Sequence, residues 1–352
     1  MDGSSECSAK QRVWTLPVRR LLKPSGRSPK EQHEQNVSSL TTVSTKPTGS
    51  TASTAAGPAG APYLRPMPTL RAATADLAAA LQTIYPAAEA DSMAGLVLEH
   101  LLHLTPLQRR MQAAELLPAE VAAQLPAIQA RLLRHEPVQY VLGVAYFLDL
   151  ELEVTPATLI PRPETEELVQ LIVREQTGRP ALSVLDVGTG SGCIPVALSR
   201  ALQPVRTVAV DVSAEALAVA RRNAARYDCE IDFQQLDILT EEPAGIVPHT
   251  LDVLVSNPPY VLETERSQMR PNVLDYEPAA ALFVPRHDPL LFYRRIAALG
   301  RKLLRPGGGL YLEINEQYAA DTVALLRGLN YADVEARTDL FGKPRMVRVT
   351  CP

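Results

Sequence analysis

The stretch SVLDVGTGSG, Ser183–Gly192, joins five residues typical of a buried strand to a loop in which every second residue is glycine. Glycine lets the backbone turn sharply and approach a ligand without a Cβ in the way. A stretch with helical periodicity follows the loop. The order of strand, glycine loop and helix predicts a ligand site at the carboxyl end of the strand.

Short apolar runs recur downstream of this loop, with helical stretches between them. The runs are TVAVDV (207–212), IDFQQL (231–236), LDVLVS (251–256) and GLYLEI (309–314), and AEALAVARRNAAR is one of the helical stretches. Strands that alternate with helices build a parallel sheet with helices on both faces. We therefore predict an α/β fold with a mostly parallel, doubly wound, Rossmann-like sheet.

The glycine loop and the ends of the next two strands predict a nucleoside site. Asp211 ends the second strand, 19 residues after Gly192, where a carboxylate can accept both hydroxyls of a ribose. The alternative for Asp211 is an N-cap of the following helix, but Ser213 can cap that helix. The loop reads G-T-G-S-G instead of G-x-G-x-x-G, which favours a nucleoside without phosphates, whose base Asp237 and Ile238 would flank. The assembled site resembles that of class I S-adenosylmethionine-dependent methyltransferases, and the predicted cofactor-binding residues are Gly188, Thr189, Gly190, Ser191, Gly192, Asp211, Asp237, Ile238 and Asn257.

The fourth strand runs into LVSNPPYV, Leu254–Val261, whose two prolines fix φ and remove backbone donors. Such a loop presents acceptors rigidly, and acceptors are what a planar NH2 group needs. The Asn257 side-chain oxygen and the Pro258 carbonyl would accept the two N–H bonds and hold the nitrogen in line with a methyl donor. Tyr260 would form a flat wall against the substrate. We predict Asn257, Pro258 and Tyr260 as catalytic residues and Asn257, Pro258, Pro259 and Tyr260 as the substrate-binding set.

The chain before the glycine loop divides into three predicted parts. Residues 1–66 are rich in Ser, Thr, Pro and Gly, so we expect a disordered tail; a targeting segment, or a true start at Met67, are the alternatives. Residues 67–136 predict a helical bundle, with a helix that starts after Thr69 and runs to Pro86, and further helices near 90–104, 106–116 and 118–134. QYVLGVAYFLDLELEV predicts a β-hairpin linker over 137–158, which leaves 159–352 for the nucleoside-binding domain. Apolar residues recur at helical spacing in the first helix at Leu70, Ala73, Leu77, Leu81 and Ile84.

The composition of the chain argues against several classes of protein and of partner. The net charge of −4 combines nine basic and four acidic residues in 1–66 with an acidic remainder, which argues against direct nucleic-acid binding. No apolar run is long enough for a membrane span. The four cysteines show no C-x-x-C spacing and none lies near a histidine pair, so we expect reduced thiols, a cytoplasmic chain and no metal site. We expect a monomer.

Several further motifs closely resemble the HemK/PrmC family of protein-(glutamine-N(5)) methyltransferases. They are PVQYVLG (137–143), LIPRPETEELV (159–169), Tyr276-Glu277-Pro278 and Gly342-Lys343-Pro344-Arg345. The resemblance covers roughly residues 68–352 and includes a helical N-terminal domain. It implies methyl transfer from S-adenosylmethionine to the glutamine side-chain amide in the Gly-Gly-Gln loop of class 1 peptide-chain release factors. The resemblance also leads us to expect that the helical bundle docks this protein substrate.

The resemblance leaves other substrates open, and the chain departs from the family pattern at a few positions. A sister family acts on a ribosomal protein, and similar N-P-P-Y loops occur in enzymes that methylate adenine or guanine; a non-catalytic cofactor-binding adaptor is a further alternative. Thr165 and Glu166, within the Pro-Glu-Thr-Glu form, favour release factors. The chain departs from the family at Asp149 and Asn315, where glycine is usual, and at Leu152, often phenylalanine; the departures at 149 and 152 concern the hairpin geometry.

The sequence leaves two roles open for Arg162, Glu164 and Glu166. They could support the catalytic site. They could equally form the first turn of a helix, with its acids at the positive end of the helix dipole.

Overall fold

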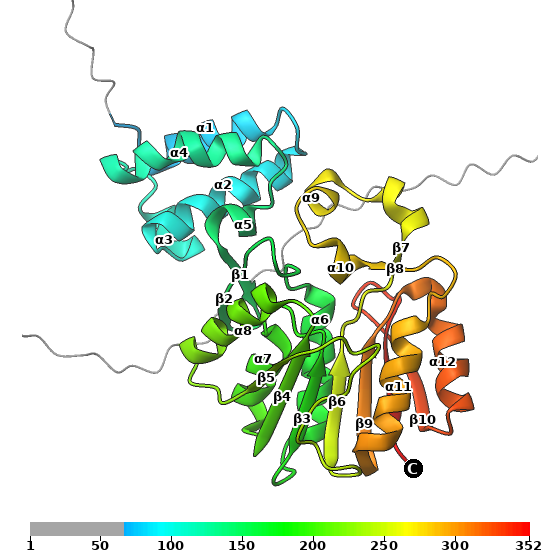
Figure 1. The fold of residues 1–352 in the computed structure, drawn as a ribbon. Helices are drawn as coiled ribbons and strands as arrows, with labels where there is room; N and C mark the ends of the chain where they lie inside the picture. The colour runs from blue at the N-terminus through cyan, green and yellow to red at the C-terminus, as the bar shows by residue number, and fades with distance from the viewer. Residues whose placement is uncertain (1–66) are drawn as a thin grey trace, which may run out of the picture. The chain divides into compact units, whose positions relative to one another are not determined.

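The computed structural model describes residues 67–352, and the chain divides into two compact units, Met1–Ala123 and Gln124–Pro352 (Figure 1). The predicted disorder of residues 1–66 lies outside the described residues. Within 67–352 no helix is both long and apolar enough to cross a membrane.

The first unit is helical, as its periodicity predicts. It contains α1 (Leu70–Leu81), α2 (Ala87–Leu102) and α3 (Pro106–Met111), and α4 (Ala119–Leu132) spans the boundary to the second unit. Thr69 caps α1 by accepting a hydrogen bond from the Ala72 amide (3.2 Å). Thr105 and Gln108 form a reciprocal capping box at the start of α3. Side-chain hydroxyls and amides therefore fix where these helices begin.

The helix ends differ from the prediction in two places. Helix α1 ends at Leu81, and Ile84, expected on its buried face, is 38% exposed. Helix α3 ends at Met111 instead of near 116. Leu70, Ala73, Leu77 and Leu81 are buried as the spacing predicts.

The second unit opens with a short helix and a hairpin. Strands β1 (Val144–Phe147) and β2 (Leu150–Glu153) pair antiparallel, which confirms the predicted hairpin. The residues before it, which we predicted as β-rich, form the helix α5 (Val138–Leu142). Pro137 precedes this helix and Gly143 closes it in the left-handed conformation (φ +73°), so local turn chemistry outweighs the β propensity of Val and Tyr.

A seven-stranded sheet forms the centre of the second unit (Figure 1). Its order is β10-β11-β9-β6-β3-β4-β5. Strands β3, β4, β5, β6 and β9 are joined by parallel pairings, and β11 pairs antiparallel with both β9 and β10, so β11 alone among these seven strands runs in the opposite direction. The mostly parallel, doubly wound sheet is thus confirmed. The strands are β3 (Ser183–Val187), β4 (Arg206–Asp211), β5 (Asp232–Gln235), β6 (Leu251–Ser256), β9 (Leu304–Glu313), β10 (Ala332–Thr338) and β11 (Pro344–Thr350).

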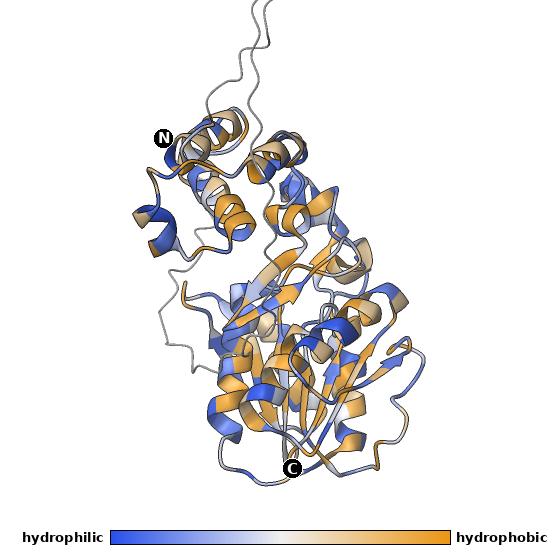
Figure 2. Ribbon diagram, turned by 90° about the vertical axis from the view of Figure 1, so that its left-hand side faces the viewer, coloured by the Kyte–Doolittle hydropathy of each residue, from blue (hydrophilic) through white to orange (hydrophobic). Residues whose placement is uncertain are grey.

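Helices cover both faces of this sheet. Alternate residues of β3 enter different cores: Leu185 and Val187 pack in a cluster with α11 and α12, and Val184 packs in a second cluster with α6 and α7. In Figure 2 the helices of this unit carry both hydrophobic and hydrophilic colouring, as expected when one side of each helix is buried. The helices are α6 (Pro163–Gln176), α7 (Cys193–Leu202), α8 (Ala214–Arg226), α11 (Leu291–Leu303) and α12 (Ala319–Gly328).

Shorter elements complete the second unit between β6 and α11 and after β9. They are β7 (Val261–Leu262), η1 (Glu263–Gln268), α9 (Pro271–Leu274), α10 (Ala279–Leu282), β8 (Phe283–Val284) and η2 (Glu316–Tyr318). Strands β7 and β8 pair parallel with each other outside the main sheet.

Candidate active site

Two loops meet where the sheet reverses its strand order. The chain proceeds from β3 outward to β4 and β5, and β6 then returns to the other side of β3. Val187 at the end of β3 pairs with Ser256 at the end of β6, and the Ser256 hydroxyl donates to the Val187 carbonyl (2.7 Å). The glycine loop and the Asn257–Tyr260 loop, which follow directly, therefore leave the sheet side by side. Crevices at such switch points bind ligands in open α/β sheets.

The three glycines of the first loop have different surroundings. All three have positive φ, +74° at Gly188, +54° at Gly190 and +79° at Gly192. A Cβ at Gly190 would meet no atom within 4 Å, and one at Gly188 would meet only the Asn257 carbonyl at 4.0 Å. A Cβ at Gly192 would lie 3.1 Å from Ala220 of α8. Gly188 and Gly190 thus border open space that a ligand can fill, and Gly192 permits close packing of α7 against α8.

Asp211 ties the glycine loop to the end of β4. Its carboxylate accepts hydrogen bonds from the Gly190 amide (2.8 Å) and the Ser213 amide (3.0 Å). Ser213 itself caps α8 by accepting from the Ala216 amide (3.1 Å), so Asp211 is not the N-cap. Burial raises the pKa of Asp211. A carboxylate has about four acceptor positions, which leaves capacity for ligand hydroxyls.

The other predicted cofactor residues lie in the same region of the chain. Thr189 and Ser191 are buried, and the Thr189 hydroxyl finds no partner within residues 67–352. Asp237 follows β5 and accepts a hydrogen bond from the Leu239 amide (2.9 Å). Ile238 is 8% exposed and belongs to the core cluster that contains α11. Roles of these residues toward a nucleoside remain predictions.

Asp186, which is not among the residues predicted from the sequence, is a buried carboxyl group beside the glycine loop. It lies in β3 and is fully buried, and among the described residues neither of its oxygens accepts a hydrogen bond of ordinary geometry. The Thr189 hydroxyl is close enough to lower its pKa, but by less than burial raises it. Burial raises its pKa to about 7. A buried carboxyl without a partner is costly, and a donor or cation bound beside the glycine loop would remove that cost. The position of Asp186 as the one acid in an otherwise apolar strand is the feature of the sequence that could have indicated a functional role.

A chain of hydrogen bonds fixes both ends of the Asn257–Tyr260 loop. The Asn257 Nδ2 donates to Thr165 Oγ1 (3.1 Å), and the Thr165 hydroxyl donates to Glu313 Oε2 (2.7 Å). The other Glu313 oxygen accepts from the Tyr260 hydroxyl (3.1 Å). Neither Asn257 Oδ1 nor the Pro258 carbonyl accepts a hydrogen bond from any described residue. Within residues 67–352 these two acceptors of the loop are therefore free, and their role toward a substrate stays a prediction.

Glu313 is the buried centre of this chain. It ends β9, is 1% exposed, and burial raises its pKa to about 7. Desolvation also raises the pKa of Tyr260 well above its usual value, so that hydroxyl stays protonated and donates. The sequence carries no functional signal for Glu313, and it marks Thr165 only as part of a family pattern. Both are missed members of the site.

Asn315, a departure from the family pattern, contacts the same loop. Its Nδ2 lies 3.1 Å from the Tyr260 carbonyl and 3.3 Å from Glu265 Oε1. The Leu262 amide also donates to Glu265 (3.0 Å). Asn315 thereby connects the end of β9 to the segment that follows Tyr260.

The structure gives separate roles to the residues around the start of α6. Helix α6 begins at Pro163, with Glu164 and Glu166 in its first turn, as the helix interpretation predicts. Arg162 pairs with the buried Glu277 (2.6 Å). Glu166 accepts from the Leu148 amide (2.9 Å) and so supports the hairpin turn, where Leu148, and not Asp149, has positive φ (+54°). Of the Pro-Glu-Thr-Glu residues, Thr165 is the one hydrogen-bonded to Asn257.

No described group of three or more His, Cys, Asp or Glu residues is arranged to hold a metal ion. Cys193, Cys229 and Cys351 are free thiols.

The chain matches known proteins over most of its length. The family model described as "PrmC N-terminal domain" matches residues 69–143, and "Methyltransferase small domain" matches residues 165–274. The release factor glutamine methyltransferase of Bacteroides thetaiotaomicron is 45% identical over 274 residues, which span 78% of this chain and 97% of that protein. The enzyme of the same name from Cereibacter sphaeroides is 35% identical over 82% of this chain and 99% of its own length. These matches span both units, and the chain is a methyltransferase that belongs to the family of release factor glutamine methyltransferases.

Proposed function

We propose that the enzyme transfers a methyl group from S-adenosylmethionine to the side-chain amide nitrogen of the glutamine in the Gly-Gly-Gln motif of class 1 release factors. The observation that carries this proposal is the fixed orientation of the Asn257 amide. Its NH2 end is held by Thr165, so Oδ1 is turned away from that partner and is free to accept. An incoming primary amide has two N–H donors, which Oδ1 and the Pro258 carbonyl can accept together.

The residues of the glycine loop fit the proposed cofactor. Gly188 and Gly190 border open space, Asp211 is fixed beside them by the Gly190 amide, and Asp186 has an unpartnered buried carboxyl. Asp211 would accept the ribose hydroxyls, Asp237 and Ile238 would flank the adenine, and Asp186 would face the cationic methionine portion. When bound, S-adenosylmethionine supplies an activated methyl group on a sulfonium.

Positioning and charge stabilisation would carry the chemistry. The amide nitrogen is a poor nucleophile because its lone pair is delocalised, and two fixed acceptors hold it in line with the methyl group. The same acceptors stabilise the positive charge that develops on the NH2 group during transfer. The ring of Tyr260, fixed through Glu313, would form a wall against the planar amide. The surplus proton leaves the nitrogen after transfer, so no general base is required.

The remaining domain and partner assignments are part of the same proposal. The helical bundle, residues 67–136, would dock the release factor, residues 137–158 would link the domains, and 159–352 would perform the transfer. Release factors act in translation, so the enzyme would work in the cytoplasm, as a monomer without membrane or direct nucleic-acid contact.

Incubation with labelled S-adenosylmethionine and purified substrates tests the proposal. We expect label in a class 1 release factor and none in a release factor whose Gly-Gly-Gln glutamine is replaced by alanine. Ribosomal proteins and DNA serve as the competing substrates. Label in either of those, with none in the release factor, would overturn the proposed substrate.

A further inference from the structure

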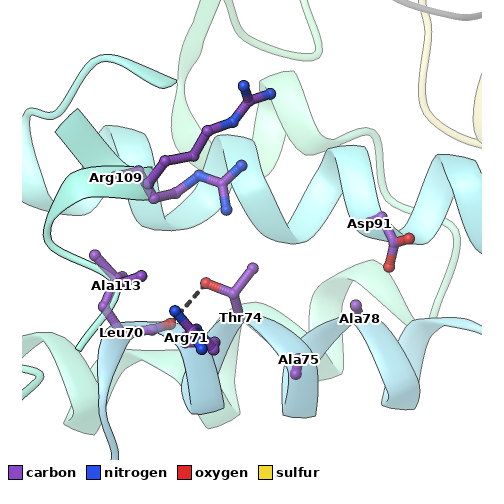
Figure 3. Close-up of a pocket in the computed structure, with 9 residues that line it drawn as sticks. Leu70, Arg71, Thr74, Ala75, Ala78, Asp91, Arg109 and Ala113 are labelled. Carbon is purple, nitrogen blue, oxygen red and sulfur yellow. Dashed lines mark hydrogen bonds between the residues drawn. The ribbon is translucent and has the colours of Figure 1, made fainter. Parts of the chain in front are cut away.

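The arginines of residues 67–123 gather around one cavity. Between residues 67 and 123 there is no lysine, and the three arginines present are Arg71, Arg109 and Arg110. All three line a cavity of about 520 Å³ among α1, α2 and α3 (Figure 3). The same stretch contains six acidic residues, so its positive charge is confined to this cavity on an otherwise acidic surface.

Arg109 is held in place on the wall of the cavity. Its Nε donates to Glu99 Oε1 (2.8 Å), and its guanidinium lies against α2 at Gly95, where a Cβ would approach within 3.0 Å. Arg71 and Arg110 are exposed, and no hydrogen bond or ion pair joins their side chains to other residues of 67–352. One arginine is thus a fixed part of the wall, and two present free guanidinium groups.

The guanidinium groups of Arg71 and Arg110 are the main hydrogen-bond donors that the cavity offers to a ligand. The Thr74 hydroxyl is engaged, since it donates to the Leu70 carbonyl (2.7 Å), as Figure 3 shows. Asp91, on α2, also lines the cavity. A guanidinium presents planar paired donors that match a carboxylate.

Exposed apolar side chains lie on the helix that supplies Arg109 and Arg110. Leu107 is 58% exposed and Met111 is 77% exposed, and they lie four residues apart, on the same side of α3. Leu116, just beyond the helix, is 67% exposed. An apolar patch beside paired arginines is typical of protein-binding surfaces, in which Met and Arg are enriched.

We infer that this arginine cavity docks an acidic segment of the protein substrate, with one or more carboxylates between Arg71 and Arg110 and an apolar side chain against Leu107 and Met111. The inference rests on the proposed function, because the release factor is the partner. A nucleic acid is the competing occupant, since a guanidinium pairs with phosphate as well as with carboxylate. The exposed apolar side chains of α3 favour a protein.

Kinetics of a charge-reversal variant test the inference. In Arg71→Glu/Arg110→Glu we expect the Michaelis constant for the intact release factor to rise roughly 10- to 100-fold. Turnover at saturating release factor and affinity for S-adenosylmethionine should stay within about twofold of wild type, which also shows that the variant folds. Arg179→Glu is the matched control: Arg179 is exposed in the second unit, and this variant should behave like the wild type. The wild-type Michaelis constant should rise with salt, and that of the double variant should rise much less.

Each alternative result has a distinct meaning. An unchanged Michaelis constant in the double variant, with the wild type active on release factors, would overturn the cavity assignment and leave the proposed function intact. A wild type that methylates no release factor would remove the proposed function and the docking partner with it. Loss of binding to a single-stranded RNA oligonucleotide, with release-factor kinetics unchanged, would mean that the cavity serves a nucleic acid and would overturn the inference.

Discussion

At the scale of single residues, the direction of one amide decides what the site can bind. The Thr165 hydroxyl donates its proton to Glu313, so its oxygen can only accept from Asn257. The buried carboxylate of Glu313 therefore sets the polarity of the whole chain of hydrogen bonds. Reversal of the Asn257 amide would place two acceptors against each other and would turn a donor toward the substrate.

Replacement of Thr165 tests this dependence. In Thr165→Val the side chain keeps its shape but loses the hydroxyl, so the Asn257 amide is no longer oriented, and turnover should fall on the order of 10-fold. Thr165→Ser retains the hydroxyl and should retain most of the activity. Separate measurement of turnover and of the Michaelis constant for S-adenosylmethionine distinguishes orientation from cofactor binding. Full activity of the valine variant would show that Thr165 does not orient the amide.

Glu313 predicts a pH dependence of stability. Its pKa in the folded protein is about 7, above the value of about 4.3 in an unfolded chain, because burial disfavours the charged form. Between these values the folded state binds the extra proton, so the free energy of unfolding should decrease as pH rises from about 5 to 7. Below about pH 4 the Glu313 carboxyl is largely protonated in both the folded and the unfolded state, so its contribution no longer changes with pH. Above about pH 8 it is ionised in both states, and the full cost of burying its charge lowers the free energy of unfolding.

Glu313→Gln should remove part of that decrease, because a glutamine does not titrate. Urea unfolding at several pH values measures the effect, which we expect to exceed about 1 kcal/mol between pH 5 and 7. Asp186 has its pKa raised in the same direction and should maintain a residual slope. Glu230→Gln, at an exposed position, is the control and should leave the slope unchanged. An identical slope in wild type and Glu313→Gln would exclude Glu313 as its source.

The candidate-site residues that directly follow strands could be predicted from the sequence. The residues that hold them in place by hydrogen bonds could not. Asn257 and Tyr260 stand out because an amide, two prolines and a phenol end an apolar run. Thr165 and Glu313 are 148 positions apart and meet only through the packing of α6 against the sheet, which periodicity does not specify. Asp186 was detectable, since a carboxylate within an apolar strand needs a partner.

At the scale of elements, the loop between β3 and α7 contains a glycine that has a positive φ and also borders unfilled space. Gly190 has φ of +54° and nothing within 4 Å of a hypothetical Cβ. Gly178, between α6 and β3, has φ of +84° and is equally open. Any other residue would therefore strain the backbone at either position. Of these two glycines, only Gly190 borders the proposed cofactor site.

Alanine at each position separates strain from cofactor contact. Gly190→Ala and Gly178→Ala should each lower the free energy of unfolding by about 1–2 kcal/mol, because alanine disfavours the left-handed region. Only Gly190→Ala should weaken the binding of S-adenosylmethionine, which calorimetry measures. Equal affinities in both variants and the wild type would remove the glycine loop from the cofactor site.

The strands at the centre of the sheet were predictable, and the elements at its edge were not. Strands β3 and β6 are buried on both faces and therefore appear as continuous apolar runs. Strand β10, ADVEART, lies at the sheet edge with several exposed residues, so its sequence gives no comparable signal. Helix α5 was misjudged because its β-branched and aromatic residues outweighed the flanking Pro137 and Gly143 in the prediction.

At the scale of the whole molecule, the boundary between the two units falls inside α4. The predicted bundle extended to residue 136, whereas the first compact unit ends at Ala123. Arg131, in the later part of α4, pairs with Glu136 and donates to the carbonyls of Tyr140 (3.2 Å) and Val141 (3.0 Å). The Tyr276 hydroxyl donates to the Arg134 carbonyl (2.7 Å). These contacts tie residues 124–136 to the second unit.

Two truncations that start on either side of these contacts should therefore differ. A chain of residues 124–352 keeps the Arg131 and Arg134 contacts, and Pro126 then lies in the first turn of the shortened helix, where proline is tolerated. A chain of residues 137–352 loses them and leaves Tyr276, beside the Glu277 that holds Arg162, without its acceptor. We expect the shorter chain to unfold at a lower temperature by several degrees, corresponding to about 2 kcal/mol. Arg131→Ala in the full chain should reproduce part of this loss, and equal melting temperatures of the two truncations would show that residues 124–136 do not stabilise the catalytic unit.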